Sequence, residues 1–188
     1  MISPVFRFLG AVLLLAGALF LLGGCALAPP ASVSSIETRI VPGVLFLPQE
    51  EETCGPTSLA MFLRFHGKEA SVRELQEETR TSGLRGSLIT DLAASARRRG
   101  VSTEVISLDL WRLRQRIEAG EPVILLVDLG MLTWSRPHYL IVYGMTPEGV
   151  VAHSGQTAGA VIPYSTLEKQ WAKMGRLAIV APVREQPT

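Results

Sequence analysis

The fold is decided by the stretch Gln49-Glu-Glu-Glu-Thr-Cys54-Gly-Pro-Thr-Ser-Leu-Ala-Met-Phe-Leu-Arg-Phe-His66, in which one cysteine precedes a helix-forming segment. Pro56 suits the first turn of a helix, where a backbone N–H has no partner inside the helix. Apolar side chains then recur at spacings of three and four residues, and Gly67 marks the end. The pattern predicts a helix that begins directly after Cys54 and buries one stripe against a core.

Cys54 would lie at the N-terminus of this helix, where free backbone N–H groups and the positive end of the helix dipole stabilise a thiolate. Five residues upstream, Gln49 can donate a side-chain N–H to an oxyanion that develops beside the Cys54 backbone N–H. These features favour a nucleophilic cysteine. The alternative is a small buried hydrophobe, a common role of free cysteine, and a histidine elsewhere is needed to separate the two.

The first 24 residues have the pattern of a signal peptide. Arg7 precedes an apolar run over residues 9–22, which is shorter than the ~20 residues that a membrane-spanning helix prefers. The run ends in Leu22-Gly-Gly-Cys25, which resembles the bacterial lipobox. The resemblance implies that Cys25 is lipidated and becomes the mature N-terminus. Ala26 then favours the outer membrane, on its periplasmic side; the alternative is an uncleaved anchor with an incidental cysteine.

Composition limits the possible partners. The chain has a net charge of +1, and removal of residues 1–24 takes away Arg7 and no acid, so the mature 164 residues are neutral. A neutral chain gives no reason to expect nucleic acid as a partner, and we assign Arg97-Arg-Arg99 to a solvated helix end. Cys54 is then left without a cysteine partner in a compartment that normally pairs cysteines, which marks it as reactive.

The rest of the chain predicts an α+β domain over residues 41–188, preceded by a Pro- and Ser-containing tether over residues 25–40. Periodicity and capping patterns predict helices first and a sheet afterwards. We expect the N-terminal helical part to pack on a C-terminal antiparallel sheet. The predicted helices cover residues 55–66, 71–79, 87–99, 109–119 and 165–171, and the predicted strands cover residues 101–106, 123–127, 139–143, 149–152 and 177–180.

Two of the three histidines differ in their setting. His66 lies at the end of the first helix and is expected to be a surface or helix-end residue. His138 precedes the apolar strand 139–143, and a strand start that faces a helix start can bring an imidazole beside Cys54. A histidine that only caps a sheet edge is the alternative for His138.

Gln49, Cys54-Gly-Pro-Thr-Ser and Pro137-His-Tyr-Leu-Ile-Val-Tyr-Gly144 together resemble the motifs of the C39 peptidases, the papain-like bacteriocin-processing or double-glycine family. The resemblance covers about residues 45–182. It implies a papain-like fold with Cys54 as nucleophile, His138 as general base and then acid, and Gln49 in the oxyanion hole. It also implies hydrolysis of a peptide bond through an acyl-thioester, without a cofactor. Cys and His are too few and too dispersed for a zinc site.

The chain departs from that family at the third catalytic position. The family usually has Asp on the strand after the histidine, whereas this chain has Val151-Ala-His153-Ser-Gly155. Three possibilities follow. His153 orients His138, or Asp128 or Gln156 takes this role in place of His153, or the site is weakened. No exporter is evident, so we expect a monomeric, lipid-anchored cysteine peptidase that acts on exported peptides or envelope proteins. The alternatives are a Cys–His acyl transferase and a catalytically weak or inactive peptide-binding or assembly lipoprotein.

Overall fold

The structure is a computed structural model that describes residues 37–83, 86–131 and 133–183. These residues belong to one compact unit that extends over residues 36–188. The predicted signal peptide, the lipidated Cys25 and most of the tether lie outside the described residues. Among the helices that the structure describes, none is long and apolar enough to cross a membrane.

The helices form where the capping and periodicity patterns predict them. A short 3-10 turn, η1 (Glu51–Thr53), leads directly into the first helix. The α-helices are α2 (Cys54–Phe65), α3 (Val72–Thr79), α4 (Ile89–Arg98), α5 (Leu110–Glu118) and α6 (Tyr164–Ala172). Ser71 caps α3 in a capping box with Glu74, and the Asp109 carboxylate accepts a hydrogen bond from the Arg112 N–H at the start of α5.

Seven strands in the described ranges form one antiparallel sheet, as expected. They are β1 (Arg39–Ile40), β2 (Glu104–Ser107), β3 (Val123–Asp128), β4 (Pro137–Met145), β5 (Gly149–Ser154), β6 (Thr157–Pro163) and β7 (Leu177–Val180). Their order is β2-β7-β3-β4-β5-β6, and β1 pairs with β4. Strand β4 is therefore central, with neighbours on both sides.

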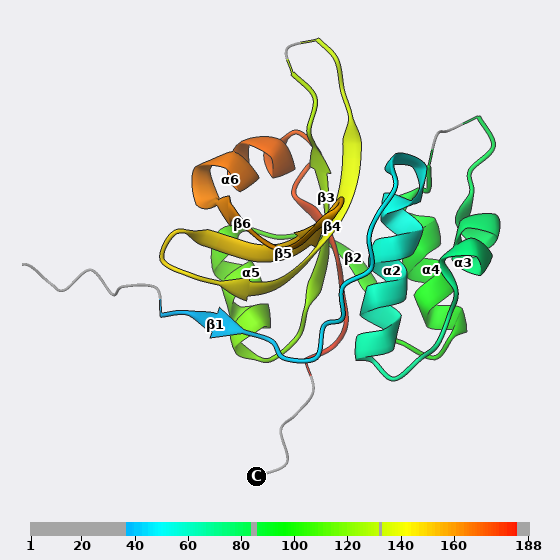
Figure 1. Ribbon diagram of the computed structural model, residues 1–188, viewed down its shortest axis with the longest axis horizontal. Coiled ribbons are helices and arrows are strands. Elements are labelled where there is room, and N and C mark those ends of the chain that lie inside the picture. The colour runs from blue at the N-terminus through cyan, green and yellow to red at the C-terminus, as the bar shows by residue number, and fades with distance from the viewer. Residues whose placement is uncertain (1–36, 84–85, 132, 184–188) are drawn as a thin grey trace, which may run out of the picture. The chain divides into compact units, whose positions relative to one another are not determined.

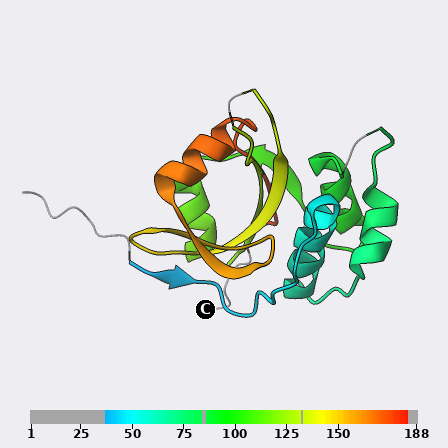
Figure 2. The same ribbon diagram turned by 45° about the horizontal axis from the view of Figure 1, so that its top comes forward.

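Two apolar cores lie on the two faces of this sheet. On one face, Tyr139 and Ile141 of β4 pack with α2, α3 and α4; on the other, Leu140 and Val142 pack with α5 and α6. Figure 1 shows α2, α4 and α3 to one side of the strands, and Figure 2 shows the sheet curving around α5 and α6. The predicted packing of an N-terminal helical part on a C-terminal sheet is confirmed.

Helix α2 is more deeply buried than its sequence pattern indicates. Every residue from Cys54 to Leu63 is buried, because sheet and helices α3 and α4 surround it. Gly55 permits the closest contact, since a Cβ there would lie 3.1 Å from both the Tyr139 ring and the Leu92 side chain. The N-terminal end of α2 is thereby held directly against β4.

Several local expectations are wrong. Strand β6 was not predicted, because a glycine interrupts its pattern and Pro163 ends it. Helix α6 begins at Tyr164 without a side-chain cap, and Glu168 instead pairs with Arg176, so the predicted Ser165–Glu168 capping box does not form. Residues 39–40 of the predicted tether form β1 in the sheet.

Leu88 falls within the segment 87–99 that the sequence predicts as a helix. It is the N-cap residue of that helix, and it is 44% exposed. The buried residues of α4 begin at Ile89 and follow the helical period through Leu92 and Ala96.

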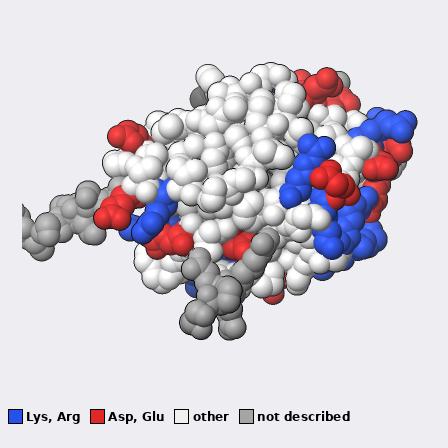
Figure 3. Space-filling model, turned by 60° about the horizontal axis from the view of Figure 1, so that its bottom comes forward, with Lys and Arg blue, Asp and Glu red and all other residues white. Residues whose placement is uncertain are grey.

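The three arginines that end α4 make structural contacts. Arg97 donates to the Thr103 carbonyl, while Arg98 and Arg99 pair with Glu78 of α3. On the face shown in Figure 3, Lys and Arg lie beside Asp and Glu, without a large region of one sign. Arg98 and Arg99 thus join α4 to α3. The face in Figure 3 does not carry the broad basic surface that a nucleic-acid site requires.

Candidate functional site

Cys54 is the first residue of α2 and lies against the beginning of β4. Its side chain is 7% exposed, and it is not in a disulfide. The backbone N–H of Tyr139 lies near the sulfur and lowers the pKa of the thiol. That N–H belongs to the peptide unit joining His138 to Tyr139, so the thiol lies within one residue of His138 along the strand.

Burial decides the protonation of this thiol. It raises the pKa of Cys54, while hydrogen bonds from the N–H groups of Tyr139, Gly55 and Cys54 and the charge of Arg136 lower it by less. The predicted effect of the helix N-terminus is present but smaller than the cost of removing a thiolate from water. The thiol is therefore protonated at neutral pH, contrary to the expectation of a stabilised thiolate.

His138 is also buried, with 8% of its surface exposed. Burial lowers the pKa of His138 to about 4, and the charge of Arg136 acts in the same direction. Its Nε2 lies 3.0 Å from the Ser154 hydroxyl oxygen. At neutral pH the ring is neutral and can accept a proton.

Ser154 is the site residue that the sequence did not reveal. It directly follows His153 in β5, and side chains alternate between the two faces of a strand. Only one of the two can therefore face His138. Both faces of β5 are lined by apolar residues, so alternation in the sequence could not indicate which one.

His153 does not orient His138. Its Nε2 lies 3.0 Å from the carbonyl oxygen of Val44, and its Nδ1 accepts a hydrogen bond of 3.1 Å from the Gly159 N–H. The ring packs against Phe46 and Tyr143, with centroid distances of 5.3 and 4.4 Å. His153 thus holds the segment before the site and the β5–β6 hairpin together.

The other two candidates for the third position also have structural partners. Asp128 accepts hydrogen bonds of 2.7 Å from the N–H groups of Gly130 and Arg136, which lower the pKa of its carboxyl and close the β3–β4 loop. Gln156 donates its side-chain N–H to the carbonyl of Gln49 over 2.8 Å.

Gln49 lies between the helix and the sheet, and its predicted place in the oxyanion hole stays a prediction. Its Nε2 donates to the Ser58 hydroxyl over 2.7 Å and to the Cys54 carbonyl over 3.3 Å. Its Oε1 accepts a hydrogen bond of 2.6 Å from the Gly155 N–H, next to Ser154. Hydrogen bonds thus bring Gln49 to Cys54 on one side and to the strand end that carries Ser154 on the other.

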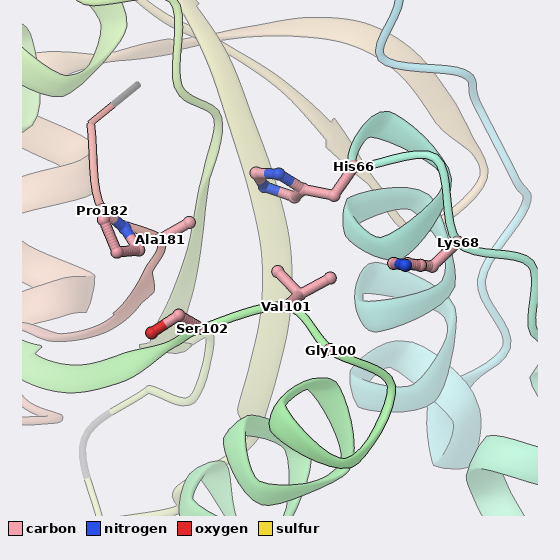
Figure 4. Close-up of a pocket in the computed structure, with 7 residues that line it drawn as sticks. All are labelled: His66, Lys68, Gly100, Val101, Ser102, Ala181 and Pro182. Atoms are coloured by element: carbon pink, nitrogen blue, oxygen red, sulfur yellow. The ribbon is translucent and has the colours of Figure 1, made fainter. Parts of the chain in front are cut away.

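His66 lies at the opposite end of α2 from Cys54, about 18 Å along the helix axis. His66 is the C-cap residue of α2, so the expectation of a helix-end residue is confirmed. Its side chain is nevertheless only 8% exposed and lies 3.7 Å from the buried Glu121 carboxylate. Figure 4 shows His66 and Lys68 beside a pocket whose other walls are residues 100–102 and 181–182. This pocket is separate from the Cys54 site.

The described residues contain no group of three or more His, Cys, Asp or Glu that could hold a metal ion. Gln49 contacts the main chain of Cys54 at the N-terminal end of α2, and the His138 imidazole contacts the Ser154 hydroxyl at the adjoining strand ends. The groups gathered in this region are a thiol, an imidazole, a hydroxyl and an amide. These groups can attack a carbonyl, move a proton and stabilise an oxyanion without a metal.

Comparisons with known proteins agree on the fold. A C39-like peptidase described from Bacillus anthracis has a TM-score of 0.66 at 20% identity, covering 80% of this chain and all of that one. The peptidase domain of Streptococcus ComA, a bifunctional ABC transporter of a quorum-sensing pathway, has a TM-score of 0.62 at 24% identity, covering 74% and 99%. A double-glycine-motif protease from an AMS/PCAT transporter, solved with its leader peptide, has a TM-score of 0.59 at 18% identity, covering 77% and 98%.

At these identities the structural likeness establishes the fold, which is the α+β fold of C39-type, papain-like peptidases. No curated protein sequence matches the chain. The sequence model of the family described as "Peptidase C39 family" matches residues 44–183, which include Gln49, Cys54, His138 and Ser154. This chain belongs to the peptidase C39 family.

Proposed function

We propose that this protein is a cysteine peptidase in which Cys54 attacks a peptide carbonyl. The position of the Cys54 thiol carries the proposal, because the thiol lines a pocket together with Pro137 and Tyr139, the two neighbours of His138 in the chain. Membership of the peptidase C39 family supports the reaction class. The substrates would be peptides, here exported peptides or envelope proteins.

The reaction begins from a neutral thiol and a neutral imidazole. His138 takes the thiol proton as the Sγ–C bond forms, and the oxyanion receives hydrogen bonds from the Cys54 N–H and the Gln49 amide. The C–N bond then breaks, and His138 gives its proton to the leaving amine. Water, activated by His138, hydrolyses the acyl-thioester and regenerates the thiol.

Ser154 and Gln49 position these groups. The Ser154 hydroxyl holds His138 Nε2, which leaves Nδ1 for proton exchange with Cys54. The Gln49 amide would exchange its 3.3 Å hydrogen bond to the Cys54 carbonyl for one to the oxyanion. Since a hydroxyl carries no charge, it orients the imidazole but stabilises the imidazolium less than a carboxylate would.

Peptide cleavage by the full chain in detergent tests this proposal. A defined peptide library is incubated with wild type and with Cys54→Ala, and new termini are measured by mass spectrometry. We expect cleavage only with wild type and a thioester adduct on Cys54 after acid quenching. Cleavage that survives Cys54→Ala, or no cleavage by either protein, would overturn the proposal.

The neutral Ser154 favours a second candidate, a peptide-binding or assembly protein with little turnover. In that case Cys54→Ala would bind the same peptides as wild type with unchanged affinity, and no acyl adduct would accumulate. Equilibrium binding measured on both proteins separates this candidate from the peptidase.

We further propose attachment to the outer membrane through lipid on Cys25, facing the periplasm. The lipobox-like Leu22-Gly-Gly-Cys25 supports this location. Metabolic labelling with a fatty-acid analogue should mark wild type and not Cys25→Ala, and wild type should fractionate with outer membranes. An unlabelled wild type would contradict lipidation.

A further inference from the structure

A pocket of about 350 Å³ opens directly at Cys54. Its walls come from the start of α2, the start of α4, strands β3 and β4 and the segment that links α6 to β7. Most of the lining side chains are apolar, among them Leu88, Ile89, Leu126, Met174 and Leu177. Ser87 and Tyr139 also line the pocket, and the Tyr139 hydroxyl donates its hydrogen bond to the Ser87 carbonyl. A volume of this size holds one large side chain.

Leu88 indicates that the pocket serves a ligand. It occupies the N-cap position of α4, where Ser, Thr, Asp or Asn would satisfy a backbone N–H of the helix, and its side chain makes no such bond. It is also 44% exposed, so it contributes little to the core. Leucine at this position gains from burial only when something apolar covers it.

The charged residues near the pocket lie at its rim. Glu51 lines the pocket, but its side chain is 78% exposed and lies 3.8 Å from the Arg136 guanidinium. The interior therefore offers no charge to a polar substrate side chain.

The pocket can also be assigned to one side of the scissile bond. The leaving amine must depart beside the His138 imidazole, which protonates it. The neighbours Pro137 and Tyr139 line the pocket, but His138 itself does not. The pocket therefore lies on the acyl side. Consecutive residues of an extended peptide advance about 3.3–3.6 Å, so a side chain that fills a pocket at Cys54 belongs to one of the two residues before the scissile bond.

We propose that the enzyme selects substrates with a large aliphatic or thioether side chain, such as Leu or Met, at one of these two positions. This inference rests on the proposed function. Two glycines there would leave the pocket unfilled. When a substrate group that fills an apolar pocket loses even one methylene, kcat/KM falls by about 10- to 200-fold. The preference for leucine over glycine should therefore be at least about tenfold.

The test measures alkylation of Cys54 by three chloromethyl ketones, acetyl-Leu-Gly, acetyl-Gly-Leu and acetyl-Gly-Gly. The Cys54 sulfur forms a bond to the methylene carbon and chloride leaves, so labelling requires binding but no turnover. The full chain is used in detergent, and each rate is divided by that of iodoacetamide to remove differences in thiol reactivity. The corresponding peptide amides are assayed for hydrolysis in parallel.

Leu88→Asp is the informative variant. Aspartate is favoured at an N-cap, so α4 should keep its stability while the pocket gains a carboxylate. Trp111→Asp is the matched control, because Trp111 is 65% exposed in the first turn of α5 and does not line this pocket. We expect one leucine reagent to label wild type and Trp111→Asp at least about tenfold faster than the Gly-Gly reagent, and Leu88→Asp to lose that preference.

Equal rates for the three reagents, or a preference that Leu88→Asp leaves unchanged, would overturn the inference. Hydrolysis without a leucine preference would overturn it while leaving the peptidase intact. A leucine preference in labelling without any hydrolysis would support the pocket and refute the peptidase. No labelling of Cys54 by any reagent would refute both, because a thiol that lines an open pocket must be reachable.

Discussion

His138 and His153 lie on neighbouring strands, and both are buried, yet their hydrogen bonds give them opposite roles. His138 has a hydroxyl at Nε2 and lies at the peptide unit that contacts the Cys54 sulfur. His153 has a main-chain partner at each ring nitrogen. A ring held by the backbone at both nitrogens cannot exchange a proton without breaking bonds that hold the fold, whereas His138 can.

The largest expected effect separates the two histidines by activity. His138→Gln removes the general base, so kcat/KM should fall by about 10²- to 10⁴-fold. His153→Gln should change kcat/KM by less than about threefold, since the ring is outside the reaction. Peptide hydrolysis with both variants checks this, with circular dichroism as the control for folding; equal losses in the two variants would contradict the assignment.

The lowered pKa of His138 predicts a pH-dependent stability. Its pKa is about 4 in the folded protein and about 6.5 when unfolded, so the unfolded chain binds more protons between these values. Stability is full above pH 6.5 and falls as pH decreases to 4, by about 3 kcal/mol from this residue. Urea unfolding at several pH values should show this decrease in wild type.

His138→Gln is the control, because this variant keeps all the carboxyl groups that also titrate in this pH range. The difference in free energy of unfolding between wild type and the variant should shrink or change sign between pH 7 and pH 4. A difference that does not depend on pH would show that folding does not lower the pKa of His138.

A stability effect is expected at His153 in place of a catalytic one. His153→Phe keeps the ring contacts with Phe46 and Tyr143 but leaves the Val44 carbonyl and the Gly159 N–H without their side-chain partner. Loss of these bonds should lower the free energy of unfolding by about 2 kcal/mol. Urea unfolding at pH 7 measures it, and an unchanged midpoint would indicate that the segment carrying Val44 contributes no stability.

The smallest expected effect concerns Ser154, a positioning residue. Ser154→Ala should lower kcat by about tenfold, the value of one hydrogen bond to the imidazole. Ser154→Asp places a carboxylate beside His138, which raises the pKa of the imidazole and moves the acid limb of kcat/KM to higher pH. If both variants keep the wild-type pH profile, Ser154 has only a structural role.

The position of Ser154 shows where prediction from sequence reached its limit. Spacing and residue type predict that Cys54, Gln49 and His138 form one group, because each lies beside a recognisable element start. Between His153 and Ser154 the sequence favoured the histidine by its chemistry. Register shifts between Val142 and Gly144 and between Ala152 and Ser154 set which side chain faces His138, and such irregularities leave no mark in an alternating apolar pattern.

The thiol shows the same limit for electrostatics. A cysteine at a helix N-terminus predicts a lowered pKa, and the N–H groups do act in that direction. Burial raises the pKa of the thiol by more than these N–H groups lower it. The extent of burial depends on how closely β4 and α4 cover the site. Leu88 is a further case, since only the tertiary arrangement places it at the pocket instead of in the core.

The sequence by itself determined the α+β class, the antiparallel sheet and the helix that starts at Cys54, because helix signals and apolar runs are local properties of the chain. Tertiary structure alone decided that Ser154 and not His153 contacts His138, that the thiol and imidazole are both neutral, and that an apolar pocket opens at Cys54. Strand register, burial and cavity shape depend on contacts between residues far apart in the chain, and no local pattern encodes them.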